Sequence, residues 1–323
     1  MRRLHLLALT IASILSAQTT EDRTFLVRNA ATEQEFNELA LAALTVSTAK
    51  VKSNDFATRQ LAVTGTVPQL QAAEWVLGEL DRPASAAPPV SKRLSLEAKA
   101  PGDELGVFYL DPAASTQSVN ELLTAVRTLS DIRYVGPYAS KHAVALRGTP
   151  EQLDFAQWLL SPTRETPTYT FPREADPREN PPENYVRVFG ARAKDVQSFN
   201  EVQTLIRTIT DTRRVYPNIG SRTIFLRGSE EQADLSLWLT AQLDKDLPLA
   251  SKSSSPSYTM RNGDIVRVFH YNAAMTQADY KTQTTALRTA TGIRRFYPYE
   301  SARTIAARGT PAQMTQLETL FQQ

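Results

Sequence analysis

Cysteine is absent from this sequence of 323 residues. Its absence excludes disulfide bonds, thiolate metal sites, a cysteine nucleophile and a lipid-modified N-terminal cysteine. Histidine is scarce, and the three copies are His5, His142 and His270. Because His142 and His270 occupy different places in the repeats described below, we expect packing or surface roles for them rather than a shared site.

The motifs of catalysis and cofactor binding are missing as well. The sequence has no HExxH spacing for a metal, and it has neither of the glycine patterns GxxxxGK[ST] and GxGxxG that bind phosphate groups. General acid–base and nucleophilic catalysis need positioned partners for proton transfer, and no such pair recurs in the chain. We therefore predict a protein that is not an enzyme, with no cofactor and no metal.

No apolar run is long enough to cross a bilayer comfortably. The longest, from Leu4 to Leu15, follows Met1-Arg2-Arg3 and precedes Ser16-Ala17-Gln18. A basic start, a short apolar stretch and small residues at its end are typical of a secretory signal peptide, so we predict that residues 1–17 are removed after Ala17. An uncleaved anchor or a buried helix is the alternative. The predicted location is the periplasm or another extracytoplasmic compartment, without a membrane span after removal of the signal.

The chain also has no excess of positive or negative charge. Without Arg2 and Arg3 the chain carries 34 basic and 34 acidic residues, so nucleic acid is not an expected partner. Apolar residues make up 41% and charged residues 22% of the chain, which is typical of globular proteins rather than of disordered ones.

One motif occurs in four copies. It consists of Gly, then Thr or Ser, then Gln three positions later: Gly65-Thr66-Val67-Pro68-Gln69, Gly148-Thr149-Pro150-Glu151-Gln152, Gly228-Ser229-Glu230-Glu231-Gln232 and Gly309-Thr310-Pro311-Ala312-Gln313. The glycines are 83, 80 and 81 residues apart. Thr or Ser followed by Gln at this distance predicts a capping box, so a helix is expected to begin in every copy.

An earlier helix is predicted in each copy. Its expected N-caps are short oxygen-bearing residues: Thr32, Ser115, Asp195 and Thr276. Apolar residues then follow at helical spacing in three copies: Phe36, Leu39, Ala43, Val46; Val119, Leu122, Val126, Leu129; Phe199, Val202, Ile206, Ile209. The fourth stripe reads Tyr280, Gln283, Leu287, Ala290, so we expect weaker packing there.

Extended stretches complete the unit, one before the first helix and two after it, with polar turns between the last two. The predicted fold class is α+β: four tandem βαββα units, each a three-stranded sheet with two helices on one face. Three copies carry a tryptophan ten residues after the motif glycine, and we expect Trp75, Trp158 and Trp238 in the cores; exposed ligand-stacking tryptophans are the alternative.

The composition between the copies changes to proline, alanine and serine, which predicts linkers between units arranged as beads on a string. The predicted bounds are 23–83, 105–161, 185–246 and 265–323 for the units, and 84–104, 162–184 and 247–264 for the linkers. The second linker is expected to be stiff and the third flexible.

Basic and aromatic residues recur on the expected second strand. We predict that they form a surface that binds a protein partner: Arg133, Tyr134, Arg213, Arg214, Tyr216, Arg294, Arg295 and Tyr297. The alternative is that alternate residues of this strand simply face water. Asp131 and Asp211 precede these strands, and we expect them to cap the helix or to pair with Arg133 and Arg213.

The end of each copy resembles the short N-terminal periplasmic domains of secretins. The resemblance is carried by Leu61-Ala62-Val63-Thr64-Gly65, by Gln69-Leu70 and by Glu79-Leu80-Asp81-Arg82-Pro83, and it recurs in Phe225-Leu226-Arg227-Gly228 with Gln242-Leu243-Asp244. It implies KH-like units that pack side by side into rings and meet other envelope components. It does not imply RNA binding, because no GxxG nucleic-acid loop is present, and it does not extend to the pore domain of secretins.

These observations predict an exported, non-catalytic scaffold or accessory protein. Its partners are expected to be further copies of itself or envelope components of a secretion or pilus system. The alternative is a multivalent repeat protein that binds polysaccharide or peptidoglycan through exposed Tyr and Arg side chains.

Overall fold

The computed structural model describes residues 19–83, 90–96, 103–161, 166–172, 183–244, 251–272 and 274–323. The predicted signal peptide lies outside these ranges, as does most of the proline-rich stretch before the third unit. No helix among the described residues is long and apolar enough to cross a membrane.

The protein is α+β, as predicted, with helices alternating with four antiparallel sheets. The first unit consists of β1 (Glu21–Leu26), α1 (Glu33–Ser47), β2 (Lys50–Asp55), β3 (Gln60–Gly65) and α2 (Val67–Leu80). The second consists of β4 (Lys92–Ser95), β5 (Glu104–Tyr109), α3 (Thr116–Ser130), β6 (Tyr134–Tyr138), the 3-10 turn η1 (Ala139–Lys141), β7 (Ala143–Gly148) and α4 (Pro150–Leu160).

The last two units repeat this order. The third consists of β8 (Thr168–Thr170), β9 (Tyr185–Gly190), α5 (Val196–Thr210), β10 (Arg214–Asn218), β11 (Thr223–Gly228) and α6 (Glu230–Leu243). The fourth consists of β12 (Ser253–Ser254), β13 (Tyr258–Thr259), β14 (Ile265–His270), α7 (Gln277–Thr291), β15 (Arg295–Tyr299), η2 (Glu300–Ala302), β16 (Thr304–Gly309) and α8 (Pro311–Gln322).

Only the first sheet has the expected three strands, in the order β1-β3-β2. The second and third sheets gain β4 and β8, which pair with the first strand of the unit, and the fourth sheet gains both β12 and β13 beside β14. All four added strands lie in segments that we predicted to be linkers. The bounds of the units themselves stay a prediction.

In all four units, the first helix begins at the predicted cap. The cap side chain accepts a hydrogen bond from the backbone N–H three residues later, at Thr32, Ser115, Asp195 and Thr276. The predicted capping boxes at the second helix of each unit are confirmed too, at Thr66, Thr149, Ser229 and Thr310. The local sequence therefore fixes where every long helix begins.

The glutamine of the capping box also holds the other helix of its unit. In the third unit, Gln232 Oε1 accepts from the N–H of Ser229 at 2.8 Å, and Gln232 Nε2 donates to the carbonyl of Thr210, at the end of α5, at 3.2 Å. The same amide reaches the end of α1, α3 and α7 from Gln69, Gln152 and Gln313. One side chain thus joins the start of the second helix to the end of the first.

This arrangement explains why glycine precedes the capping box. A Cβ on Gly228 would lie 2.6 Å from Gln232 Oε1, and one on Gly148 would lie 2.7 Å from Gln152 Oε1. These distances are shorter than a nonbonded contact allows, so a side chain on the glycine would displace the glutamine from its hydrogen bonds.

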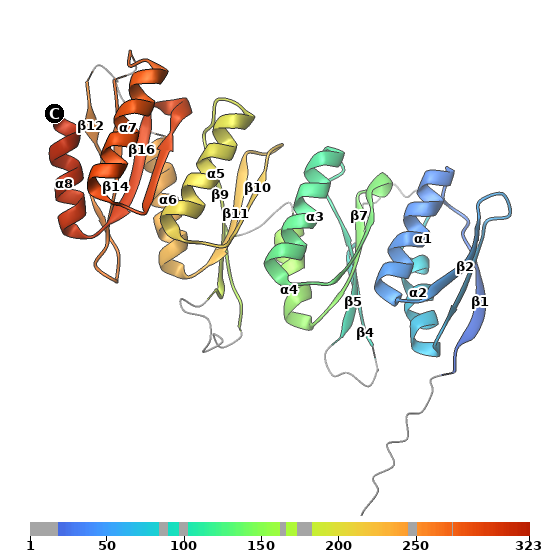
Figure 1. Ribbon diagram of the computed structural model, residues 1–323. Helices are drawn as coiled ribbons and strands as arrows, with labels where there is room; N and C mark the ends of the chain where they lie inside the picture. The colour runs from blue at the N-terminus through green and yellow to red at the C-terminus, as the bar shows by residue number, and fades with distance from the viewer. Residues whose placement is uncertain are drawn as a thin grey trace, which may run out of the picture.

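The units are not beads on a string, because each sheet packs on the helices of the unit before it (Figure 1). Helix α1 contacts β6, α3 contacts β10 and α5 contacts β15. The hydrophobic cores have the same arrangement, since the core around α1 and α2 includes Leu105, Tyr138 and Ala145 of the second unit. The molecule is therefore a stack in which layers of sheet and layers of helix alternate.

The burial of the third strand of each unit reflects this stacking. In β3 of the first unit, buried and less buried residues alternate, because only one face of that sheet is covered. In β7 the run Ala143-Val144-Ala145-Leu146 is buried throughout, because its sheet has helices on both faces.

The tryptophans are half-buried at the edges of the cores, where they contact the added strands. Trp158 of α4 lies 5.4 Å from Tyr169 of β8, and Trp238 of α6 lies 5.5 Å from Tyr258 of β13, measured between ring centroids. The strands β8 and β13 therefore contact the second helix of the preceding unit. The corresponding residue of the fourth unit is Thr319, on α8, and it is exposed.

We expect Gly228→Ala to lower the free energy of unfolding by about 1–3 kcal/mol, because the added methyl group displaces Gln232 from hydrogen bonds at both helices. The matched control is Gly78→Ala on α2, where a Cβ meets nothing within 4 Å. This control should raise stability by about 0.5–1 kcal/mol, because alanine favours the helix. Urea unfolding followed by circular dichroism measures both, and equal effects of the two substitutions would contradict the role of the glycine.

Candidate functional site at the unit interfaces

Three junctions join the four units, and each uses the arginine just before the motif glycine. Arg147 Nη1 donates to the carbonyl of Val46 at 3.5 Å, Arg308 Nη1 donates to that of Ile209 at 3.3 Å, and Arg227 reaches Leu129 in the same way. These carbonyls lie in the last turn of the preceding first helix, where they have no partner within the helix and where the helix dipole favours a cation. The first unit has Thr64 at this position.

A glutamate on the first helix forms the second contact of each junction. Glu38 Oε2 accepts from the backbone N–H of Ser140 at 2.9 Å, Glu121 Oε2 from that of Ile219 at 2.8 Å, and Glu201 Oε2 from that of Ser301 at 3.1 Å. The N–H groups lie in the hairpin after the second strand of the following unit. At each junction, the first helix of one unit therefore binds the hairpin of the following unit at two points. One is the glutamate on the helix, and the other is the last turn of the helix.

An aspartate at the left-handed C-cap of the first helix adds an ion pair at two junctions. Asp131 Oδ2 lies 2.8 Å from Arg214 Nη1 and 3.3 Å from Arg227 Nη1, and Asp211 pairs with Arg295. We expected these aspartates to cap the helix or to pair with Arg133 and Arg213: both do lie at the C-cap, but their ion pairs are with other arginines. The φ of 61° at Asp131 and at Asp211 turns the chain, and the partners come from the following unit.

The predicted partner-binding residues separate into two groups. Five of them contact the preceding unit of the same chain: Tyr134, Arg214, Tyr216, Arg295 and Tyr297. The other three, Arg133, Arg213 and Arg294, are exposed. The aromatic rings of the first group are half-buried between units, so they do not form an open surface on which a polysaccharide could stack.

The three exposed arginines occupy the same position of the repeat, fifteen residues before the motif glycine. Lys50 occupies this position in the first unit and is exposed as well. These four basic residues therefore occupy equivalent, exposed positions of the four stacked units, and we call them the basic row (Lys50, Arg133, Arg213 and Arg294).

The second junction differs from its neighbours in one buried residue. At the last residue of the second strand, Tyr138 and Tyr299 insert into the core of the preceding unit, where they are 2% and 5% exposed. The third unit has Asn218 there. Asn218 Oδ1 accepts from the N–H of Ser221 at 3.0 Å, and its Nδ2 donates to the carbonyl of Ser118 at 3.4 Å.

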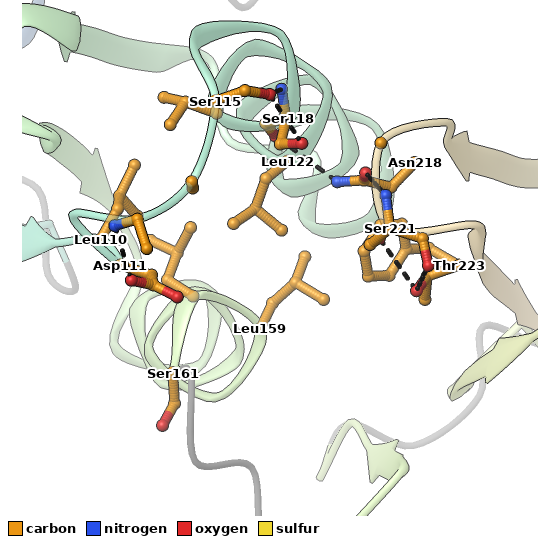
Figure 2. Close-up of a pocket in the computed structure, with 16 residues that line it drawn as sticks. Leu110, Asp111, Ser115, Ser118, Leu122, Leu159, Ser161, Asn218, Ser221 and Thr223 are labelled. Carbon is orange, nitrogen blue, oxygen red and sulfur yellow. Dashed lines mark hydrogen bonds between the residues drawn. The ribbon is translucent and has the colours of Figure 1, made fainter.

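A cavity of about 530 Å³ lies beside Asn218, between α3, α4 and the β10–β11 hairpin (Figure 2). Leu110, Leu122 and Leu159 form its apolar wall. The Asn218 amide and several hydroxyl groups line it too: Ser115, Ser118, Ser161, Ser221 and Thr223. Asp111 is its one charged lining residue, and the carboxylate accepts from the backbone N–H of Ala113 at 2.8 Å.

The two described histidines have structural partners. A ring nitrogen of His142 lies 3.1 Å from the carbonyl of Ala114, and Nδ1 of the buried His270 lies 3.1 Å from Thr304 Oγ1. No group of three or more His, Asp or Glu side chains that could hold a metal ion occurs among the described residues.

No protein-family model matches the sequence, and no curated protein matches it. Among solved structures, the chain is similar to Aeromonas hydrophila ExeD, with 14% identity, a TM-score of 0.17, and coverage of 78% of this chain and 44% of that one. It is similar to the ETEC pilotin–secretin AspS–GspD complex with 13% identity and a TM-score of 0.17, covering 94% of this chain and 55% of that one. It also matches an aspartate kinase from Synechocystis with 12% identity and a TM-score of 0.16, over the same 94% and 55%.

The chain thus spans about half the length of these proteins. Because all three TM-scores are below 0.2, the matches carry no argument about the function of this chain.

The junction between the first two units should weaken in acid. Burial opposes ionisation of Glu38, but hydrogen bonds from Gln34 and Ser140 outweigh it, so the pKa of Glu38 lies below its ordinary value of 4.5. A lowered pKa means that the ionised group stabilises the fold above about pH 5 and that this contribution is lost as the pH falls further.

We expect Glu38→Gln to be less stable than the wild type at pH 7 by about 1 kcal/mol, and to lose less stability between about pH 5 and pH 3, because glutamine does not titrate. Urea unfolding at several pH values measures this dependence. Glu33→Gln, at an exposed position of the same helix, is the control. If the free energy of unfolding of Glu38→Gln depends on pH as that of the wild type does, Glu38 does not stabilise the junction.

Proposed function

We propose that the protein is an exported, non-catalytic scaffold that mediates protein–protein association in the cell envelope. The observation that supports this most directly is the repeated junction, in which one helix face binds the strand hairpin of the following unit three times in a single chain. Side-by-side association of small α+β units is what the resemblance to secretin N-terminal domains implies. The partner is then a second copy of the chain or an envelope component of a secretion or pilus system.

The basic row is the surface that we assign to this partner. It differs from the junction surfaces because its four side chains are exposed in the stack, whereas the five predicted residues at the junctions are occupied within the chain. Cations at equivalent positions of successive units fit a partner with repeated carboxylates, such as an acidic face of another repeat protein. Several weak ion pairs made together give avidity that one exposed pair cannot supply.

The test replaces Lys50, Arg133, Arg213 and Arg294 with alanine together. We expect the variant to lose the envelope proteins that the full-length wild-type chain retains, or to lose self-association in light scattering, while its thermal unfolding stays unchanged. A charge-matched control replaces the exposed residues Arg28, Arg127, Arg261 and Arg288 with alanine and should bind as the wild type does. A wild-type chain that is strictly monomeric and retains no envelope protein would exclude this function.

Export is tested separately. The chain recovered from outside the cytoplasm should lack residues 1–17, as measured by intact mass. Leu7→Arg should keep the chain in the cytoplasm, because a charge interrupts the apolar run that the export machinery recognises. His5→Arg extends the basic start of the same segment and should leave export unchanged. A full-length mass outside the cytoplasm would show instead that residues 1–17 act as an anchor.

A further inference from the structure

The cavity at the second junction lies beside Asn218, whose counterparts at the other two junctions are tyrosines. The three residues Tyr138, Asn218 and Tyr299 end their strands at the same register, where they pair with Ala143, Thr223 and Thr304. All three are buried in the junction. Asn218 is the smallest of them, and it lines an open cavity, whereas the two tyrosines belong to the hydrophobic cores.

Three apolar wall residues correspond between the sites of Tyr138 and Asn218. The core that contains Tyr138 includes Val27, Leu39 and Val76, all 0–1% exposed. Counted from the motif glycine, their counterparts in the second unit are Leu110, Leu122 and Leu159, which form the apolar wall of the cavity. The cavity therefore keeps this apolar lining without a tyrosine, and the ring that lines it is the buried Phe225, which stands where the other two junctions have Ala145 and Ala306.

The second junction also has a serine hydroxyl where the third junction has one near the hydroxyl of Tyr299. The hydroxyl of Tyr299 lies close enough to the side chain of Ser198 to interact with it. The counterpart of Ser198 in the second unit is Ser118, whose side chain faces the cavity in Figure 2. A hydroxyl group placed as in Tyr299 would meet the Ser118 hydroxyl and the Asn218 amide.

We propose that the cavity between the second and third units binds a p-hydroxyphenyl ring, with its face on Leu110, Leu122 and Leu159 and its hydroxyl at Ser118 and Asn218. The ligand carries no negative charge, because the cavity offers hydroxyl and amide groups together with one carboxylate, and it has no cation to pair with an anion. The ring can come from a free phenol or from a tyrosine side chain of a partner protein. This proposal does not depend on the proposed function, since the site lies within one chain.

The test is calorimetric titration of the full chain with p-cresol, the side chain of tyrosine as a free molecule. We expect one site per wild-type chain. Asn218→Tyr places the missing ring in the cavity, so binding of p-cresol should weaken at least about tenfold, and the melting temperature should not fall. Asn200→Tyr adds the same side chain at an exposed position of α5 and should bind as the wild type does. Benzoate should bind at least about tenfold more weakly than p-cresol, because of its charge.

The reverse substitution gives a second readout. Tyr299→Asn opens the corresponding space at the third junction, so the number of p-cresol sites should rise from one to two. Titration with the blocked tripeptide Gly-Tyr-Gly distinguishes the two sources of the ring, because its binding requires room for a peptide backbone. Absence of p-cresol binding to the wild type, or undiminished binding to Asn218→Tyr, would overturn the proposal, and neither result bears on export or on the basic row.

Discussion

The amide of one glutamine per unit is the contact on which the rest of the stack depends. Its oxygen completes the capping box of the second helix and its nitrogen holds the last turn of the first helix, so the two helices form a layer of fixed geometry. The following sheet packs on that layer. The last-turn carbonyls and the αL aspartate that lie beside the glutamine are the groups that the arginines of the following unit bind. A shift of this side chain would therefore affect the unit itself and the junction to the next one.

Much of the local structure was predictable because it depends on residues close together in the sequence. Helix starts follow from caps such as Ser115 and Thr149. Gln283 and Ala290 of the fourth stripe are half-buried and exposed, and weaker packing of that unit stays a prediction. The fold class was predicted from the same patterns. The number of strands was not, because β4, β8, β12 and β13 are short and pair in segments whose proline and serine content indicates linkers.

The docking of the units was missed, although the sequence carried a signal for it. The third strand alternates in the first unit, as in Leu61-Ala62-Val63-Thr64, but is continuously apolar in Ala143-Val144-Ala145-Leu146. A continuous run of this kind indicates a sheet that is covered on both faces. The pairing of Asp131 with Arg214 and Arg227 could not be read in the same way, because it joins residues more than eighty positions apart. For the same reason, a cavity beside Asn218 becomes visible only when the three junctions are compared.

The substitution of asparagine for tyrosine at the middle junction also divides the stack. The first and second units are locked by Tyr138 and the third and fourth by Tyr299, whereas the halves meet through a hairpin with a cavity beside it. The molecule thus has two junctions closed by a tyrosine and a middle junction that is held by an ion-paired aspartate and opens to solvent beside Asn218. The repeat is therefore asymmetric about its centre, although its four units share one design.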